Sequence, residues 1–452
     1  MKKVQIFLES DIIIRHFILN DTFKEIEREC SVQYIISDDH RVQTPIDKLN
    51  LKNVKLIKVN RKRLGKMRQL IKALGLRKIQ DKPKYQFLKD IWKGILPEKS
   101  YKRIKLYSHP LIFPIYRFFT LLLLGNYPEL EEAVDDFKPD VILHPCVLEG
   151  LFISDLISTS KKRNIPFVVL MNSWDNPSTK ATVLGLPDYL VVWGEQTMSH
   201  AIEFMDMPAD KIKKFGAAQF EVYKAPPLKT RKQYCQEASI DPEKTLIIYA
   251  GSSKSINEIE HLQTLENAIQ SGDITDTHII FKPHPWRATP EGEPDFFSID
   301  WKHISMDPGM VPYYKRSVEK NDDSIQLSSY MDTHIILSSA DILISNVSTI
   351  LLEAALHGMP IMCMVSDKEI EENNFLRVTL NSLYFNDLME RLDVARCKDH
   401  QEIVIECKKL IDKFMTPDFK DKQIEKTKFF VELKEKSYGQ QVFELIKNIG
   451  KG

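Results

Sequence analysis

The sequence is poor in cysteine and in long apolar runs. Six cysteines are scattered over 452 residues, and no two of them form a Cys-x-x-Cys pair. This spacing argues against a zinc site and is typical of a reduced, cytosolic protein. The longest apolar run, over 118–124, is far shorter than the about 20 residues of a membrane-spanning helix. The apolar N-terminus soon reaches Glu9 and Asp11, which predicts a buried strand and not a signal peptide.

The chain also lacks a net charge, because 63 Lys and Arg residues balance 63 Asp and Glu residues. Without a basic excess, nucleic acid is not an expected partner. The composition, with 43% hydrophobic and 28% charged residues, is that of a globular protein and excludes a disordered chain. The length predicts two or three domains.

Charge is nevertheless distributed unevenly. Residues 51–105 contain 19 basic and three acidic residues, a local balance of +16, so the remainder of the chain carries −16. Over 61–72 the basic residues alternate with apolar ones, and aromatic and aliphatic residues follow over 111–119. Such a mixture predicts contact between residues 51–105 and an anionic membrane surface or an anionic acceptor. The alternative is a solvated helical face that happens to be basic.

Short apolar strands alternate with helical patterns in both halves of the chain. This order predicts an α/β protein with two Rossmann-like parallel-sheet domains that face a central cleft. We expect an N-terminal domain over 1–222, with a basic helical insertion at about 51–136. A C-terminal domain should span 223–436, and a closing helix 437–452. Two prolines within 216–230 mark the linker between the domains.

A first group of candidate binding residues follows the buried strand predicted over 341–345. Asn346 and Ser348 are placed to cap the next helix, and Thr349 begins it. The free N–H groups at the start of that helix would bind phosphate. Glu353, one turn later on the face of Thr349, would accept hydrogen bonds from ribose hydroxyls. The alternative is an ordinary capped turn between a strand and a helix.

A second group follows two other predicted strands. Lys282, His284 and Arg287 lie just beyond the strand over 278–281, where three donors could surround phosphate oxygens. The strand over 245–250 ends at Gly251 and Ser252. We therefore predict that these residues also bind the phosphates of a donor.

Candidate catalytic bases lie after strands of the first half. Glu9 and Asp11 follow the first strand, Glu149 follows the strand over 140–144, and Asp175 follows the strand over 167–170. Any of these carboxylates, or His16, could take a proton from an acceptor hydroxyl. Asp11 is the first choice and Glu149 the second. In the alternative reading, Asp11 caps the first helix, Glu149 serves the helix after it, and Asp175 braces its own loop with a nearby lysine.

These motifs resemble those of GT-B glycosyltransferases, particularly the bacterial enzymes that make surface or capsular polysaccharides. The Lys-Pro-His-Pro segment over 282–285 and the Ser/Thr turn before a Glu-containing helix resemble their donor-binding domain. In the first half, segments 15–17, 173–176 and 193–195 are similar to the same group. The resemblance implies that His284 and the turn at 348–349 bind donor phosphate. UDP-sugar 2-epimerases and CDP-glycerol glycerophosphotransferases share this architecture.

The resulting prediction is a metal-independent, inverting glycosyltransferase that uses a nucleotide sugar and no further cofactor. No Asp-x-Asp pair occurs in the chain, whereas GT-A transferases commonly hold a metal ion with such a pair. The acceptor would be a glycan or a lipid-linked sugar, and the protein would be cytoplasmic or peripheral at the inner face of the membrane. The alternatives are a 2-epimerase, a glycerol-phosphate transferase and a non-catalytic scaffold that binds nucleotide.

Overall fold

The computed structural model describes residues 1–79, 86–180, 182–251, 258–284, 294–320, 329–399 and 402–449. The chain forms two compact units. Unit 1 comprises Met1–Glu221 together with Lys428–Gly452, and unit 2 comprises Val222–Thr427. The last segment of the chain therefore belongs to the same unit as the first.

Unit 1 is built on a parallel sheet that has seven strands within the described residues. Its neighbouring strands, in spatial order, are β3 (Val54–Ile57), β2 (Ser31–Ser37), β1 (Lys3–Leu8), β4 (Val141–Cys146), β5 (Phe167–Met171), β6 (Tyr189–Val192) and β7 (Ile212–Lys214). The central strands β1, β4 and β5 are mostly apolar, and all of their residues except Lys3 are buried, as expected for a sheet covered on both faces.

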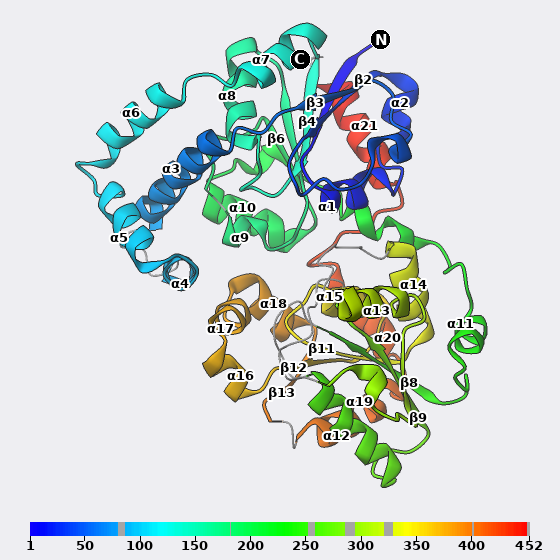
Figure 1. Cartoon of the computed structure of the whole chain (residues 1–452). Coiled ribbons are helices and arrows are strands. Elements are labelled where there is room, and N and C mark those ends of the chain that lie inside the picture. The colour runs from blue at the N-terminus through cyan, green and yellow to red at the C-terminus, as the bar shows by residue number, and fades with distance from the viewer. Residues whose placement is uncertain are drawn as a thin grey trace. The chain divides into compact units, whose positions relative to one another are not determined.

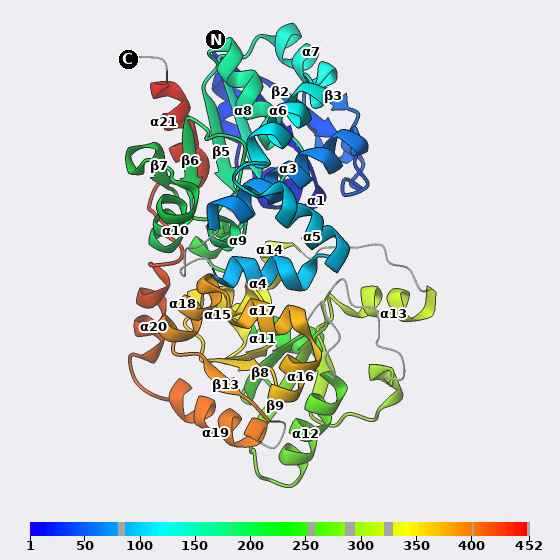
Figure 2. The ribbon, with the colours of Figure 1, turned by 90° about the vertical axis from the view of Figure 1, so that its left-hand side faces the viewer.

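Helices cover both faces of this sheet (Figures 1 and 2). The helices and helical turns of unit 1 include α1 (Asp11–Ile13), the π-helical turn η1 (Ile14–Ile18), α2 (Lys24–Glu29), α7 (Pro128–Phe137), α8 (Ile153–Arg163), α9 (Asn176–Thr179), α10 (Glu195–Met205) and α21 (Tyr438–Asn448). The C-terminal helix α21 packs against α2, and Tyr438, Val442 and Ile446 are part of the buried core.

Between β3 and β4 the chain makes a helical excursion. It consists of α3 (Arg61–Ile79), α4 (Gln86–Ile95), α5 (Glu98–Tyr107) and α6 (Phe113–Leu124). The helix α3 packs against the other three, and a Cβ atom at Gly75 would lie 2.0 Å from the ring of Trp92 on α4. Two parts of the segment 51–136 belong instead to the sheet layer, because β3 pairs with β2 and α7 packs on β1 and β3.

Unit 2 is built on a second parallel sheet, with six strands in the part that the structure describes. In spatial order these are β10 (Ile304–Met306), β9 (Thr277–Lys282), β8 (Thr245–Ala250), β11 (Ile342–Ser345), β12 (Ile361–Met364) and β13 (Ala395–Cys397). The described residues thus form the two parallel-sheet α/β domains that the sequence predicts.

The helices of unit 2 are α11 (Arg231–Ala238), α12 (Glu258–Gln270), α13 (Val311–Lys320), α14 (Tyr330–Ser339), α15 (Ile350–Leu356), α16 (Asp367–Glu372), α17 (Asn374–Leu380), α18 (Leu383–Arg391), α19 (Ile403–Phe414) and α20 (Phe419–Thr427). Apolar residues of α12 and α19 pack on the sheet and form one continuous core with β8, β9, β11 and β12. Because all strands of a sheet run in the same direction, their carboxyl ends share one edge.

Candidate functional site

Three neighbouring strands of unit 2 end at the predicted donor-binding residues. In the sheet, β8 lies between β9 and β11, and Ala250 is in register with both Lys282 and Ser345. Gly251, His284 and Asn346 follow these strands, so the structure brings them to adjacent positions along one edge. Two further candidates, Ser252 and Arg287, lie outside the described residues.

Gly251 occupies a position where a larger residue would force its neighbours to shift. A Cβ atom there would lie 2.7 Å from Oε2 of Glu258 and 3.1 Å from the backbone nitrogen of His284. Glu258 is the first residue of α12 and is fully buried. The backbone therefore approaches both a buried carboxylate and the predicted phosphate-binding histidine. Sequence reasoning missed Glu258, although its position at the start of a predicted helix after Gly251 was a signal.

The side chains of Lys282 and His284 have different environments. Lys282 is buried, and its Nζ lies 3.3 Å from Oδ2 of Asp307, whose other oxygen accepts a hydrogen bond from Tyr234. The lysine therefore already has an acidic partner within the protein. His284 is half-buried, and burial, helped by the charge of Lys282, lowers its pKa to about 4. At neutral pH the imidazole is uncharged and can donate one hydrogen bond.

The turn after β11 differs from the prediction in one respect. Neither Asn346 nor Ser348 caps α15; Thr349 is the N-cap residue and its side chain makes no capping hydrogen bond. The physical reason is that Thr349 already has helical backbone angles, so the turn enters the helix directly. Asn346 is fully buried, and neither its amide nitrogen nor its amide oxygen has a hydrogen-bond partner in the described structure. An unsatisfied buried amide is costly, so a water molecule, an ion or a ligand is expected to bind there.

Glu353 lies on α15 and is buried. Its Oε2 accepts a hydrogen bond from the hydroxyl of Tyr223, and its backbone oxygen accepts one from Nδ1 of His357 at 2.7 Å. The ring of Tyr223 packs on both His357 and His334. Tyr223 lies in the predicted linker and was not a candidate, because a lone tyrosine near two prolines forms no recognisable pattern.

In unit 1 the first-choice base is already engaged. One carboxylate oxygen of Asp11 accepts a hydrogen bond from the backbone N–H of Gln43 at 2.9 Å, and the other accepts one from Thr44 at 3.1 Å. The alternative role of Asp11 as a helix cap is wrong, because Ser10 is the N-cap residue of α1. Asp11 holds the loop at 43–44.

His16 lies in the π-helical turn η1 and is buried. Its Nδ1 is hydrogen-bonded to Oδ1 of Asn172 at the end of β5. Burial, together with the charge of Arg15, lowers the pKa of His16 to about 3. The imidazole is therefore neutral at physiological pH.

Asp175 braces its own loop, as the alternative reading has it. Burial alone would raise the pKa of its carboxyl group, but the charge of Lys180 and hydrogen bonds from Ser173, Lys180 and Thr179 outweigh burial and lower the pKa. The Nζ of Lys180 lies 3.0 Å from Oδ2 of Asp175. A carboxylate held in this way is a weak proton acceptor.

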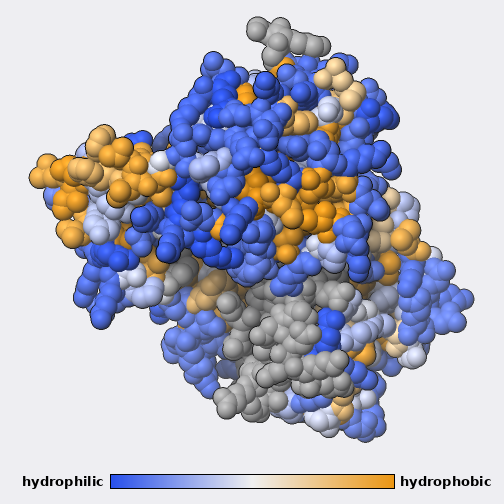
Figure 3. Space-filling model, turned by 45° about the horizontal axis from the view of Figure 1, so that its top comes forward, coloured by the Kyte–Doolittle hydropathy of each residue, from blue (hydrophilic) through white to orange (hydrophobic). Residues whose placement is uncertain are grey.

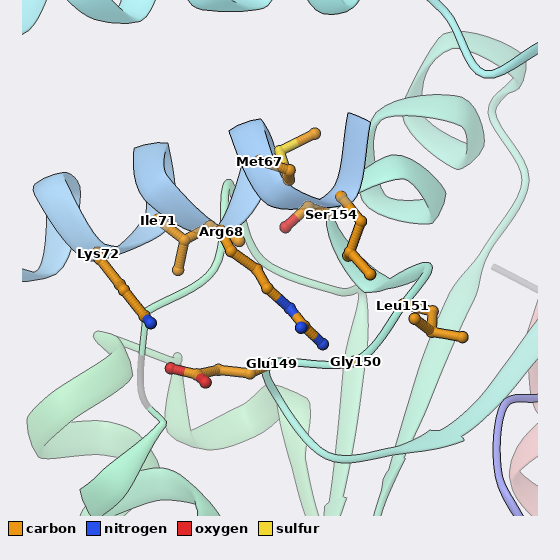
Figure 4. A pocket seen from close by; sticks show the side chains of 9 residues that line it. Met67, Arg68, Ile71, Lys72, Glu149, Gly150, Leu151 and Ser154 are labelled. Atoms are coloured by element: carbon orange, nitrogen blue, oxygen red, sulfur yellow. The ribbon is translucent and has the colours of Figure 1, made fainter. Parts of the chain in front are cut away.

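Glu149 lines a small pocket beside α3 (Figure 4). Arg68 and Lys72 project from α3 over the turn that carries Glu149 and Gly150 (Figure 4). The remaining lining residues are mostly apolar: Leu64, Met67, Ile71, Leu151 and Ser154. The pocket is small and combines a carboxylate with two cationic side chains and an apolar wall.

Glu9 lies behind this pocket and is almost fully buried. Its Oε2 accepts the backbone N–H of Leu151 at 2.6 Å, and a Cβ atom on Gly150 would come within 2.5 Å of Oε1. Nε2 of His144 lies 3.7 Å from Oε2. Burial raises the pKa of Glu9 from 4.5 to about 7, and the Leu151 hydrogen bond opposes this shift. A carboxyl group with this pKa can exchange a proton near neutral pH.

No known protein-family model matches the sequence, and no curated protein sequence does. Solved structures do match. A Listeria monocytogenes protein assigned as a UDP-N-acetylglucosamine 2-epimerase aligns with a TM-score of 0.55 and 10% identity, over 99% of this chain and 96% of that one. The UDP-GlcNAc 2-epimerase of Neisseria meningitidis, bound to UDP-GlcNAc, gives 0.52 and 14%, over 99% and 100%. MurG of Acinetobacter baumannii gives 0.50 and 11%, over 99% and 100%.

The chain has the GT-B fold. Two all-parallel sheets and a likeness that extends over nearly the whole chain support this assignment. At 10 to 14% identity this likeness establishes the fold alone. The reaction has to be inferred from the chemistry of the candidate site.

Two structural observations bear on metals and membranes. Among the described residues of this GT-B protein, no group of three or more His, Cys, Asp or Glu side chains is arranged to hold a metal ion. Within the same ranges, every helix is too short or too polar to cross a lipid bilayer. All six cysteines are buried and free.

Proposed function

We propose that this GT-B protein transfers a sugar from a nucleotide-sugar donor to a hydroxyl group of a glycan or lipid-linked acceptor in surface-polysaccharide synthesis. The observation that carries the proposal is the row of strand ends in unit 2, where Gly251, His284 and Asn346 lie at neighbouring positions. The fold supports it, because structures with this fold include a UDP-GlcNAc-bound epimerase.

On the donor side, His284 donates a hydrogen bond to a phosphate oxygen as a neutral imidazole. The amide of Asn346 gains the partner that it lacks in the described structure. Glu353, held by Tyr223, accepts hydrogen bonds from the ribose hydroxyls. Fixed donors of this kind stabilise the charge of the leaving nucleotide, and the proposed reaction needs no metal ion.

On the acceptor side, Glu149 is the proposed base. It lines a pocket, whereas both oxygens of Asp11 are occupied by backbone N–H groups and Asp175 is paired with Lys180. The carboxylate of Glu149 takes the proton of the acceptor hydroxyl. At the same time the hydroxyl oxygen of the acceptor bonds to the anomeric carbon of the donor sugar. The bond from that carbon to the phosphate oxygen breaks, and the nucleoside diphosphate leaves with the bonding electrons. A single in-line displacement inverts the anomeric configuration.

Site variants test this proposal. His284→Ala should weaken UDP binding at least about tenfold, because a hydrogen bond to a charged phosphate contributes about 1.5–3 kcal/mol. Glu149→Gln should reduce transfer by about 100-fold or more and leave UDP affinity unchanged. Glu129→Gln, an exposed change on α7, is the matched control. Transfer at the wild-type rate in both site variants would refute the assignment.

Product analysis separates the proposal from its alternatives. Incubation of the protein with a nucleotide sugar alone would yield an epimerised nucleotide sugar if the protein is a 2-epimerase. Preference for CDP or CMP over UDP in a binding assay would indicate a glycerol-phosphate transferase. Binding without turnover, for a panel of acceptors, would indicate a scaffold.

A further inference from the structure

The helix α6 presents an apolar surface to solvent. Six large apolar side chains on α6 and in the turn before it are more than half exposed, from 55% for Phe119 to 77% for Leu111. These residues, which we call the α6 surface, are Leu111, Ile115, Phe118, Phe119, Leu122 and Leu123. Figure 3 shows a gathering of hydrophobic atoms at the end of the helical excursion. Exposed apolar patches of this kind mark contact sites.

The amphipathic pattern of α6 is the reverse of that in an ordinary surface helix. Positions 115, 118, 119, 122 and 123 lie on one face by helical spacing, and this face is exposed. The buried positions on the opposite face are Phe113 and Thr120. A helix that only completed a core would turn its apolar stripe inward.

The orientation of α6 is fixed by α3. Arg63 on α3 donates a hydrogen bond to the backbone oxygen of Leu124 and is paired with Asp155 on α8. The guanidinium group of Arg77 lies 5.4 Å from the ring centre of Phe113. These contacts hold the buried face of α6 against the protein, so the apolar face points outward in the folded unit.

Basic side chains accompany the α6 surface. Residues 98–124 contain five basic residues and one acidic residue, Glu98, and therefore carry a formal charge of +4. The basic residues are Lys99, Lys102, Arg103, Lys105 and Arg117. The helix α5 adjoins α6, because the rings of Tyr107 and Tyr116 stack with centres 4.2 Å apart. Lys102 forms a salt bridge with Glu98. Burial raises the pKa of Tyr116 on α6, and the positive charge of Arg103 on α5 opposes this larger effect, so Arg103 lies near α6.

We propose that the α6 surface inserts into the headgroup region of an anionic lipid bilayer, where the basic residues of α5 and α6 contact the lipid headgroups. An apolar helix face with adjoining positive charge complements a bilayer that is apolar inside and anionic at its surface. The basic residues select this occupant over an uncharged apolar protein surface.

The proposal differs from the membrane contact that the sequence of 61–72 suggests. Met67, Leu70 and Ile71 of α3 are buried and are therefore unavailable to lipid. Replacing all basic residues of 61–72 would also remove Arg63, which holds α6 and α8.

The inference stands apart from sugar transfer, because binding to vesicles requires neither nucleotide nor acceptor.

Co-sedimentation of the full chain with vesicles tests the proposal. Vesicles of phosphatidylcholine are compared with vesicles that contain roughly 30% phosphatidylglycerol, whose headgroup is anionic. The wild-type protein should bind the anionic vesicles, and its affinity should fall as salt rises. The variant Phe118→Ser/Phe119→Ser/Leu122→Ser should bind them on the order of 100-fold more weakly.

Two further variants separate the apolar and the electrostatic contributions. Arg103→Ser/Lys105→Ser/Arg117→Ser should lose roughly 100-fold in affinity for anionic vesicles, since each basic residue near an anionic surface contributes about 1 kcal/mol. A matched control replaces three exposed apolar residues of unit 2 and should bind like the wild type. It is Leu228→Ser/Ile405→Ser/Met415→Ser.

Several outcomes would overturn the proposal. The proposal is wrong if the wild-type protein does not co-sediment with anionic vesicles, or if it binds neutral and anionic vesicles equally. It is also wrong if the Phe118/Phe119/Leu122 variant binds anionic vesicles as tightly as the wild type. A wild-type dimer that this variant converts to a monomer without lipid would assign the surface to a second copy of the chain. If the triple variant fails to fold, Phe118→Ser and Leu122→Ser are measured singly.

Discussion

Replacing Glu9 by Gln should stabilise the protein increasingly as the pH rises. In the folded state, burial raises the pKa of Glu9 from 4.5 to about 7. The folded protein therefore holds a proton that the unfolded chain releases between these two pH values. Stability is lost as the pH rises through this window, because the buried carboxyl group must ionise without sufficient compensation.

The size of the effect follows from the same shift. A difference of about 2.5 pH units corresponds to a penalty of about 3 kcal/mol once the carboxylate is fully ionised. About 2 kcal/mol of this penalty develops between about pH 5 and about pH 8. Gln resembles the protonated carboxyl group: its oxygen can accept the Leu151 N–H, and its amide can face Nε2 of His144.

Urea unfolding at about pH 5 and about pH 8 measures the difference between Glu9→Gln and the wild type. The gap in the free energy of unfolding should widen in favour of the variant by about 2 kcal/mol. Glu129→Gln, on the exposed side of α7, should show no such pH dependence. A gap for Glu9→Gln that stays constant with pH would refute the reasoning, because it would mean that Glu9 ionises normally in the folded state.

Three further predictions concern unit 2. Gly251→Ala should destabilise the protein by about 1–3 kcal/mol in urea unfolding, since the new methyl group meets a carboxylate and a backbone nitrogen, whereas Gly65→Ala, at an exposed position of α3 where a Cβ atom meets no neighbour, should not destabilise the protein. Asn346→Leu should raise the free energy of unfolding by about 1 kcal/mol and weaken UDP binding about tenfold by calorimetry; stronger binding would contradict the assigned role. Tyr223→Phe removes the hydrogen bond that holds Glu353, so the preference for UDP over 2′-deoxy-UDP should become smaller if Glu353 contacts the ribose. An unchanged preference would refute that contact.

The central strands could be predicted from the sequence, and the edge strands could not. Strands such as β5, β8 and β11 are buried on both faces, and their continuous apolar residues predict them directly. The strands missed in the sequence are β3, β7, β10 and β13, which form the four edges of the two sheets. They have three or four residues each and are partly exposed, so their composition resembles that of loops.

The layout of the candidate site was predictable to the same degree. The positions of His284 and Asn346, just beyond the ends of central strands, could be predicted because a parallel sheet fixes where its strands end. Their roles in binding stay predictions. Partners that approach from elsewhere in the chain could not be found in this way. Tyr223 reaches Glu353 across 130 positions, and Asp307 reaches Lys282 from an undetected edge strand. Such contacts depend on packing, which a local pattern does not encode.

The return of the C-terminal segment to unit 1 has a consequence for biosynthesis. Tyr438 and Val442 of α21 contribute buried side chains to the core around the first strands. During translation, unit 2 emerges in full before unit 1 possesses all of its residues. Unit 1 is thus translated first and completed last. A stop codon shortly after Thr427 would remove α21 from the core of unit 1 and leave the residues of unit 2 intact.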